Sequence, residues 1–147
     1  MKKTAAAVAL ASLAGCAMGI QDSSPQVSYE VDRPYQAVHA RALDQANECL
    51  RGDSMFDARL ISFDRRQSVF DVREHLDTAA GQGEVTVNDP LTGAVVARTQ
   101  LRALGPNRTA VTQAVWGKGS WDGKTLHAMQ QSILMDASVC TVYKVGK

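Results

Sequence analysis

The chain has 147 residues, of which 45% are hydrophobic and 21% are charged, and its formal net charge is +1. A chain of this length can bury the core of one domain but is short for two. Its nearly balanced charge leaves no electrostatic footprint for nucleic acid and no polybasic patch for a membrane surface. We therefore expect no nucleic-acid partner, and any attachment to a membrane has to come from another feature.

The first 16 residues have the pattern of a secretory signal. Lys2 and Lys3 form a positive n-region, and residues 4–13 form an apolar stretch that is too short to span a bilayer. The small-residue cleavage site ends in a cysteine, in the sequence Leu13-Ala14-Gly15-Cys16. This segment resembles the lipobox of bacterial lipoproteins, in which a signal peptidase cuts before the cysteine and the cysteine sulfur receives a diacylglycerol. The alternative is an ordinary secretory signal with a chance cysteine.

The resemblance implies that residues 1–15 are removed and that Cys16 carries the lipid. Losing Lys2 and Lys3 changes the formal charge from +1 to −1. One acyl chain holds a protein only marginally, but a lipoprotein cysteine carries two or three, which is enough for a stable anchor. Ala17 follows the cysteine, where lipoproteins retained in the inner membrane typically carry Asp. The resemblance therefore implies the periplasmic face of the outer membrane of a Gram-negative bacterium.

Cys49 and Cys140 are left for other roles. In an oxidising periplasm an isolated pair of cysteines predicts a disulfide bond, and two buried free thiols are the alternative. The sequence contains no C-x-x-C motif, which argues against a thioredoxin-like redox role.

Residues 16–26 are mostly small or polar and predict a flexible tether between the lipid and the domain. The domain itself is expected to cover residues 27–140 and to begin with a strand, because Val27, Tyr29 and Val31 alternate with polar residues. Residues 141–147 are expected to form a polar tail.

A helix is predicted next, with Asp32 as its N-cap and Pro34 in its first turn, where a missing N–H costs nothing. Gly52 is expected to end this helix as its C′ residue. Small apolar residues at helical spacing form one narrow face, which comprises Tyr35, Val38, Ala42, Ala46 and Cys49.

Between residues 58 and 117 the apolar residues recur with a period of two, which predicts antiparallel strands joined by turns. The strands are expected at 58–63, 68–76, 85–87, 94–104 and 109–116, with Phe70 and Val72 facing inward. In the long strand 94–104 one face should be buried and the other solvent-exposed. The buried face carries Val95, Ala97 and Leu101, and the exposed face carries Arg98, Gln100 and Arg102.

A second helix is predicted to begin at a cap provided by Ser120 or Asp122. Its apolar face is expected to comprise Leu126, Met129, Ile133, Ala137 and Cys140. The order strand, helix, four or five strands, helix predicts a two-layer α+β fold with both helices on one face of a curved antiparallel sheet of four to six strands. This is the arrangement of helix-grip or TBP-like domains. A Cys49–Cys140 disulfide would join the C-terminal ends of the two helices.

No group of residues predicts catalysis, a metal or a cofactor. His39, His75 and His127 fall on three different elements, without nearby cysteines or a second histidine at ligand spacing. No serine has the context of a nucleophile elbow, and Gly117-Lys118-Gly119-Ser120 lacks the first glycine of a Walker A loop. We therefore expect a protein that is not an enzyme.

Both tryptophans of the chain lie close together, in the glycine-rich stretch from Trp116 to Trp121. An exposed pair beside Lys118 could stack on a sugar, lie at a membrane interface or bind a protein partner. Alternatively, the rings close one end of the core. Because Trp121 precedes a helix and follows a flexible turn, it is expected to be the more exposed ring. Trp116 is expected to point inward.

The layout from Val111 to Gly119, followed by Trp121-Asp122 and the Met129-Gln-Gln-Ser132 helix, resembles small uncharacterised lipoproteins of Bordetella- and Burkholderia-like bacteria. The function favoured is a non-enzymatic module that binds a protein of the cell envelope. The alternative is a module that binds a glycan or lipid, a small molecule held in a groove between sheet and helix with Trp116 or Trp121. An apolar cavity in that groove would favour ligand binding, and a filled core with an exposed Trp patch would favour a protein partner.

Overall fold

The computed structural model describes residues 17–52 and 69–141. The chain forms, in order, β1 (Gln26–Val31), α1 (Tyr35–Gln45), a π-helical turn η1 (Ala46–Leu50), β2 (Asp71–Asp77), β3 (Gln82–Asn88), β4 (Val95–Gly105), β5 (Arg108–Val115) and α2 (Gly123–Met135). The strand predicted at 58–63 and its turn at 64–67 lie outside the described residues. So do Cys16 and residues 142–147 of the predicted tail.

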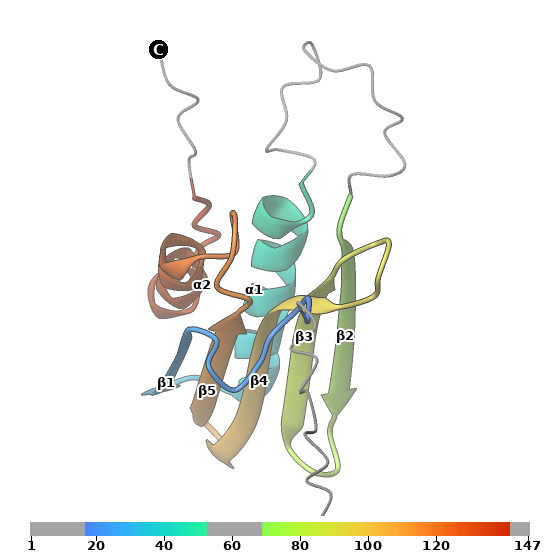
Figure 1. Cartoon of the computed structure of the whole chain (residues 1–147). Helices are drawn as coiled ribbons and strands as arrows, with labels where there is room; N and C mark the ends of the chain where they lie inside the picture. Colours follow the sequence, from blue (N-terminus) through green and yellow to red (C-terminus); the bar gives the residue numbers. More distant parts are fainter. Residues whose placement is uncertain (1–16, 53–68, 142–147) are drawn as a thin grey trace, which may run out of the picture.

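The strands form one open antiparallel sheet in the order β1-β5-β4-β3-β2. Helices α1 and α2 lie side by side on one face of this sheet, and within residues 17–52 and 69–141 no helix covers the opposite face (Figure 1). The predicted α+β class with two helices on one face of an antiparallel sheet is therefore confirmed. We call the face without helices the outer face.

The core fills the space between the sheet and the helices. All five residues of the predicted α1 face are buried, and so are Val85 and Val87 of β3. In β4 the side chains of Ala97 and Leu101 are buried and those of Gln100 and Arg102 are exposed, as the alternation predicts. Val95 and Arg98, predicted on the buried and the exposed face, are both half-buried. Beneath the sheet the Tyr29 hydroxyl donates to Gln113 Oε1 at 2.8 Å, and Gln113 Nε2 donates to Thr99 Oγ1 at 3.2 Å. These buried polar groups thus satisfy one another.

Helix α1 begins later than the sequence predicts. Its N-cap is Pro34 rather than Asp32, and the Pro34 carbonyl accepts the N–H groups of Ala37 and Val38 at 3.1 Å. A residue that precedes proline is disfavoured in the α region, so Arg33 cannot join the helix and Asp32 cannot cap it. At the other end Gly52 follows η1 with φ +94°, which is the left-handed conformation expected of a C′ residue.

Helix α2 begins as predicted but ends early. The Asp122 side chain caps it by accepting the N–H groups of Lys124 and Thr125. The helix was expected to continue through Ala137 and Cys140, but Asp136 adopts a left-handed conformation with φ 51° and terminates it. Asp136 forms ion pairs with Arg33 at 2.7 Å and with Arg41 at 3.1 Å, which explains why the chain turns there. Ala137 and Cys140 are consequently exposed and lie outside the helix.

Residues 17–25 lie against the sheet, where the sequence predicts a flexible tether. The Ile20 N–H donates to the Val95 carbonyl at 2.8 Å, and the Pro25 carbonyl accepts from Val115 at 3.1 Å. The Ser24 hydroxyl donates to the Trp116 carbonyl at 3.2 Å. Figure 1 shows this N-terminal segment running from β1 across β5 and β4. The described chain therefore begins close to the start of β4.

Candidate functional site

The outer face carries polar side chains in rows that cross the sheet. Strand register places one residue of each strand in the same row, and side chains of a row point to the same face. The central row comprises His75, Glu84, Gln100, Thr112 and Ser28. The row beside it comprises Asp77, Gln82, Arg102, Ala110 and Glu30.

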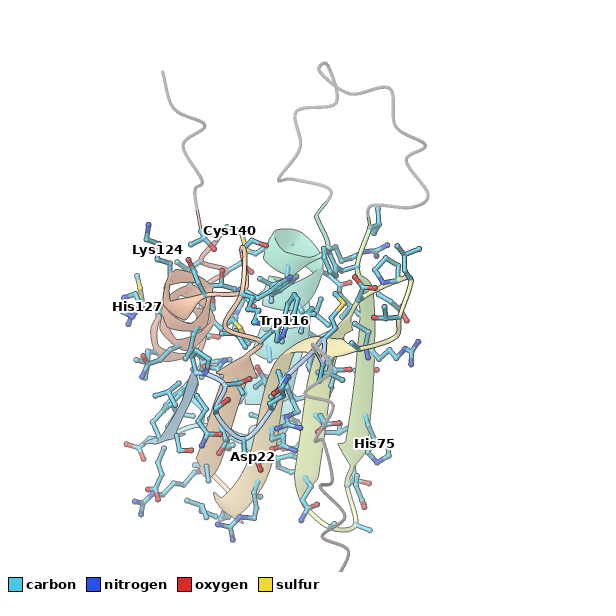
Figure 2. All side chains as sticks on the ribbon, viewed as in Figure 1. Asp22, His75, Trp116, Lys124, His127 and Cys140 are labelled. Carbon is cyan, nitrogen blue, oxygen red and sulfur yellow. A yellow bond between two sulfur atoms is a disulfide. The ribbon has the colours of Figure 1, made fainter. Side chains whose placement is uncertain are left out.

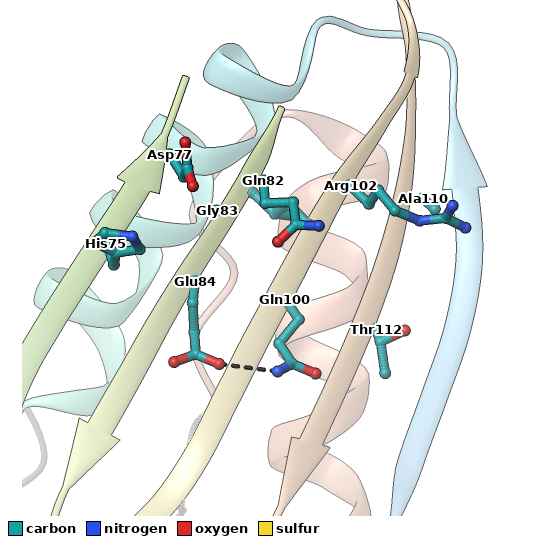
Figure 3. Close-up of a pocket in the computed structure, with 10 residues that line it drawn as sticks. His75, Asp77, Gln82, Gly83, Glu84, Gln100, Arg102, Ala110 and Thr112 are labelled. Carbon is teal, nitrogen blue, oxygen red and sulfur yellow. Dashed lines mark hydrogen bonds between the residues drawn. The ribbon is translucent and has the colours of Figure 1, made fainter. Parts of the chain in front are cut away.

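These two rows form a shallow hollow of about 450 Å³ on the outer face. In Figure 3 the side chains of His75, Glu84, Gln100, Arg102 and Thr112 stand on the near side of the sheet, with the helices behind it. Glu84 accepts a hydrogen bond from Gln100 Nε2 at 2.9 Å. The hollow therefore offers carboxylate, amide, guanidinium, imidazole and hydroxyl groups on a rigid backbone.

Charges on this face are only partly compensated. Glu30 pairs with Arg108, and Asp71 pairs with Arg73 at 2.7 Å. Within residues 17–52 and 69–141, Arg102 makes no ion pair although it projects into the hollow. An exposed guanidinium of this kind can donate hydrogen bonds to a carboxylate of a partner.

The histidines are separated, as the sequence predicts. His39 is buried in the core beside Glu74, and His75 lies on the outer face. His127 lies on α2, on the other side of the molecule from His75 (Figure 2). In the part of the chain that the structure describes, no group of three metal-ligating side chains is close enough to hold an ion. Nor is any helix there long and apolar enough to cross a membrane.

The structure reverses the expected exposure of the two tryptophans. Trp121 is only 6% exposed, and its ring contacts Phe70 edge to face with centroids 4.9 Å apart. The prediction that Trp121 is the exposed ring is therefore wrong. Trp116 is the partly exposed ring, packed against the rim of the core with the Lys118 ammonium 5.8 Å from its centroid. Neither tryptophan lines the outer-face hollow.

A disulfide links Cys49 and Cys140, whose Cα atoms are 5.0 Å apart. Cys49 is buried in η1, and Cys140 lies in the segment that follows α2. That segment folds back along the helix, where the Val139 N–H donates to Ser132 Oγ at 2.8 Å. The disulfide therefore ties η1, which continues α1, to the segment after α2, close to where the sequence places it.

The outer-face rows could not be identified from the sequence. Arg98, Gln100 and Arg102 show the alternation of an exposed strand face, but a single strand does not reveal which residues of its neighbours stand in the same row.

Scans of the chain against models of protein families and against curated proteins found no match.

Proposed function

We propose that the protein is a lipoprotein anchored in the outer membrane, facing the periplasm, where it acts as a non-enzymatic interaction module. The observation that supports this proposal is the outer face, a polar surface that crosses the whole sheet and is left uncovered by the helices. We assign the fold to the helix-grip or TBP-like group. The lipobox at Cys16 supports the anchor, through the resemblance described above.

A protein partner fits the outer face better than a glycan or lipid does. The residues that line the hollow include no phenylalanine, tyrosine or tryptophan on which a sugar could stack, and they are mostly polar. The interface between sheet and helices is filled by core residues, so it does not favour the apolar ligand that the alternative requires. Polar groups in a row are typical of the rim and hydrogen-bonding part of a protein interface.

The charge of the hollow indicates what the partner presents. Arg102 projects from β4 without an ion pair among the described residues, and Gln100 stands in the adjacent row. A carboxylate on the partner could accept a charge-assisted hydrogen bond from this guanidinium. We therefore expect an acidic or carbonyl-rich segment of an envelope protein at this position. A charge at such a surface affects the association rate as well as the affinity.

The test is site-specific photo-crosslinking in whole cells. A photoreactive residue at Gln100 should trap a discrete envelope protein, whereas the same residue at Ala40, which is exposed on α1, should not. Arg102→Glu should then reduce trapping from position 100, because it places a carboxylate where the partner is expected to present one. Trapping that is equal from both positions, or unaffected by the charge reversal, would contradict an interface on the outer face.

A further inference from the structure

The loop between β3 and β4 holds a large aliphatic side chain in an unusual position. Leu91 is 80% exposed, the highest exposure among the large hydrophobic residues described. Its loop is rigid, because Asp89 Oδ1 accepts the N–H groups of Leu91 and Thr92 at 3.0 and 2.9 Å. Gly93 also donates to the Asp89 carbonyl at 2.8 Å. A single exposed leucine is common on protein surfaces, so what Leu91 can do depends on what lies beside it.

The carboxylate in this loop is turned toward the loop itself. The Thr92 backbone N–H, with further hydrogen bonds from the Thr92 side chain and the Leu91 N–H, holds the pKa of Asp89 below its ordinary value. The carboxylate therefore stays ionised and accepts hydrogen bonds from donors of its own loop, while the Leu91 side chain is exposed.

The start of the described chain lies beside this loop. Met18, which is 36% exposed, contacts Thr92 through its sulfur at 3.6 Å from Thr92 Oγ1. Gly19 packs so closely on Val95 that an added Cβ would lie 3.0 Å from the Val95 carbonyl oxygen. Ala17 is held by a hydrogen bond from the Gln21 side chain at 2.6 Å. The N-terminal segment therefore reaches the β3–β4 loop as a fixed element.

This placement determines where a lipid would leave the domain. Consecutive Cα atoms are about 3.8 Å apart, so a lipidated Cys16 would start next to Ala17 with no spacer between lipid and domain. We propose that Leu91 and Met18 form a second membrane contact, which inserts beside the acyl chains of Cys16 at the boundary between headgroups and hydrocarbon. This proposal rests on the lipid anchor proposed above. The occupant of this apolar patch is the bilayer itself.

The contact would also fix the orientation of the outer face. Val95 begins β4 at the proposed contact, and Arg102 lies seven residues further along the strand. At a rise of roughly 3.3 Å per residue, the hollow around Arg102 is held roughly 20–25 Å from that loop. The polar rows therefore stay in the aqueous periplasm, where an envelope protein can reach them.

The test uses the full-length protein, purified from membranes and reconstituted in vesicles of phosphatidylethanolamine and phosphatidylglycerol. An environment-sensitive fluorophore is attached to Leu91→Cys, with Leu104→Cys as the control. Leu104 is also an exposed leucine, at the far end of β4. Mass spectrometry verifies lipid on Cys16, and flotation verifies binding to the vesicles.

We expect the label at position 91 to shift its emission to the blue and to be quenched by spin-labelled lipids, whereas the label at position 104 remains unquenched. Equal quenching at both positions in lipidated, vesicle-bound protein would overturn the second contact and leave the anchor intact. Protein that carries no lipid and does not float with vesicles would overturn the anchor, and the second contact with it.

Discussion

The ring of His39 occupies the space that a side chain at residue 83 would need. A Cβ placed on Gly83 would lie 2.9 Å from His39 Cδ2, closer than real Cβ contacts allow, and 3.3 Å from Leu76 Cδ1. His39 is 5% exposed, and its Nε2 lies 3.2 Å from the Glu74 carboxylate. The glycine in β3 is therefore the reason that α1 can pack its histidine against the sheet.

Replacing Gly83 with alanine should destabilise the protein by about 1–3 kcal/mol, because overpacking outweighs the smaller gain from a stiffer unfolded chain. The loss of stability caused by Gly83→Ala should be smaller in a His39→Ala background, where the ring that the new Cβ would contact is absent. Chemical denaturation of the four proteins of this cycle measures the difference. An equal cost in both backgrounds would mean that the ring is not what Gly83 accommodates.

Asp136 gives the stability a dependence on pH. The hydrogen bond from Arg41, together with the charge of Arg33, holds the pKa of its carboxyl below the ordinary value. A lowered pKa contributes stability above the ordinary Asp pKa, and this contribution disappears as the pH falls through the lowered value. Asparagine tolerates the left-handed conformation, so Asp136→Asn tests the charge alone. The variant should have a lower melting temperature than the wild type at neutral pH and the same melting temperature in strong acid. A constant difference in melting temperature at every pH would contradict this origin.

Breaking the disulfide at its exposed end should separate the effect of the bond from that of packing. Cys140→Ser removes the link between residues that are 91 apart in sequence. It should lower the free energy of unfolding by roughly 4–5 kcal/mol in the chain-entropy model. Cys49→Ala should cost more, because Cys49 is 2% exposed and its loss also leaves a cavity. Rapid alkylation of both thiols in the untreated native protein would contradict the bond.

The two tryptophans should differ in their effect on stability. Trp121→Ala should destabilise the protein by roughly 3–5 kcal/mol, because the ring is buried against Phe70. Trp116→Ala should cost less. Trp116 Nε1 is buried without a hydrogen-bond partner among the described residues, so Trp116→Phe should be neutral or stabilising. Denaturant melts give the free energy of unfolding of the three variants. A larger loss of stability for Trp116→Ala than for Trp121→Ala would contradict the prediction.

Cys16→Ser tests the anchor directly. The variant should accumulate as uncleaved or soluble protein, because it lacks the acyl chains, and the two exposed side chains of Met18 and Leu91 are too few to hold it at a membrane. Fractionation after a high-salt wash is the measurement. A variant that still fractionates with outer membranes would show that something other than the lipid holds the protein there.

Features of the fold that depend on neighbouring residues could be predicted from the sequence. Features that depend on contacts between distant residues could not. The Asp122 cap and the left-handed Gly52 depend on neighbouring residues, and the sequence predicts both. The burial of Trp121 depends on Phe70, which lies 51 residues earlier in the chain. The end of α2 depends in the same way on Arg33 and Arg41, and the path of residues 17–25 depends on backbone groups of β4 and β5. Alternation and capping carry no information about such distant pairings.

The sheet order has a consequence for when the protein can fold. Among the described strands β1 pairs with β5 alone, as in the pairing of Gln26 with Ala114, and Cys49 forms its disulfide with Cys140. A nascent chain that stops before Arg108 would leave β1 unpaired and Cys49 reduced. Closing such long loops costs chain entropy before the stabilising contacts form. The native state can therefore form only after the last strand has been synthesised. Nearly the whole chain must therefore be synthesised before the native state can form.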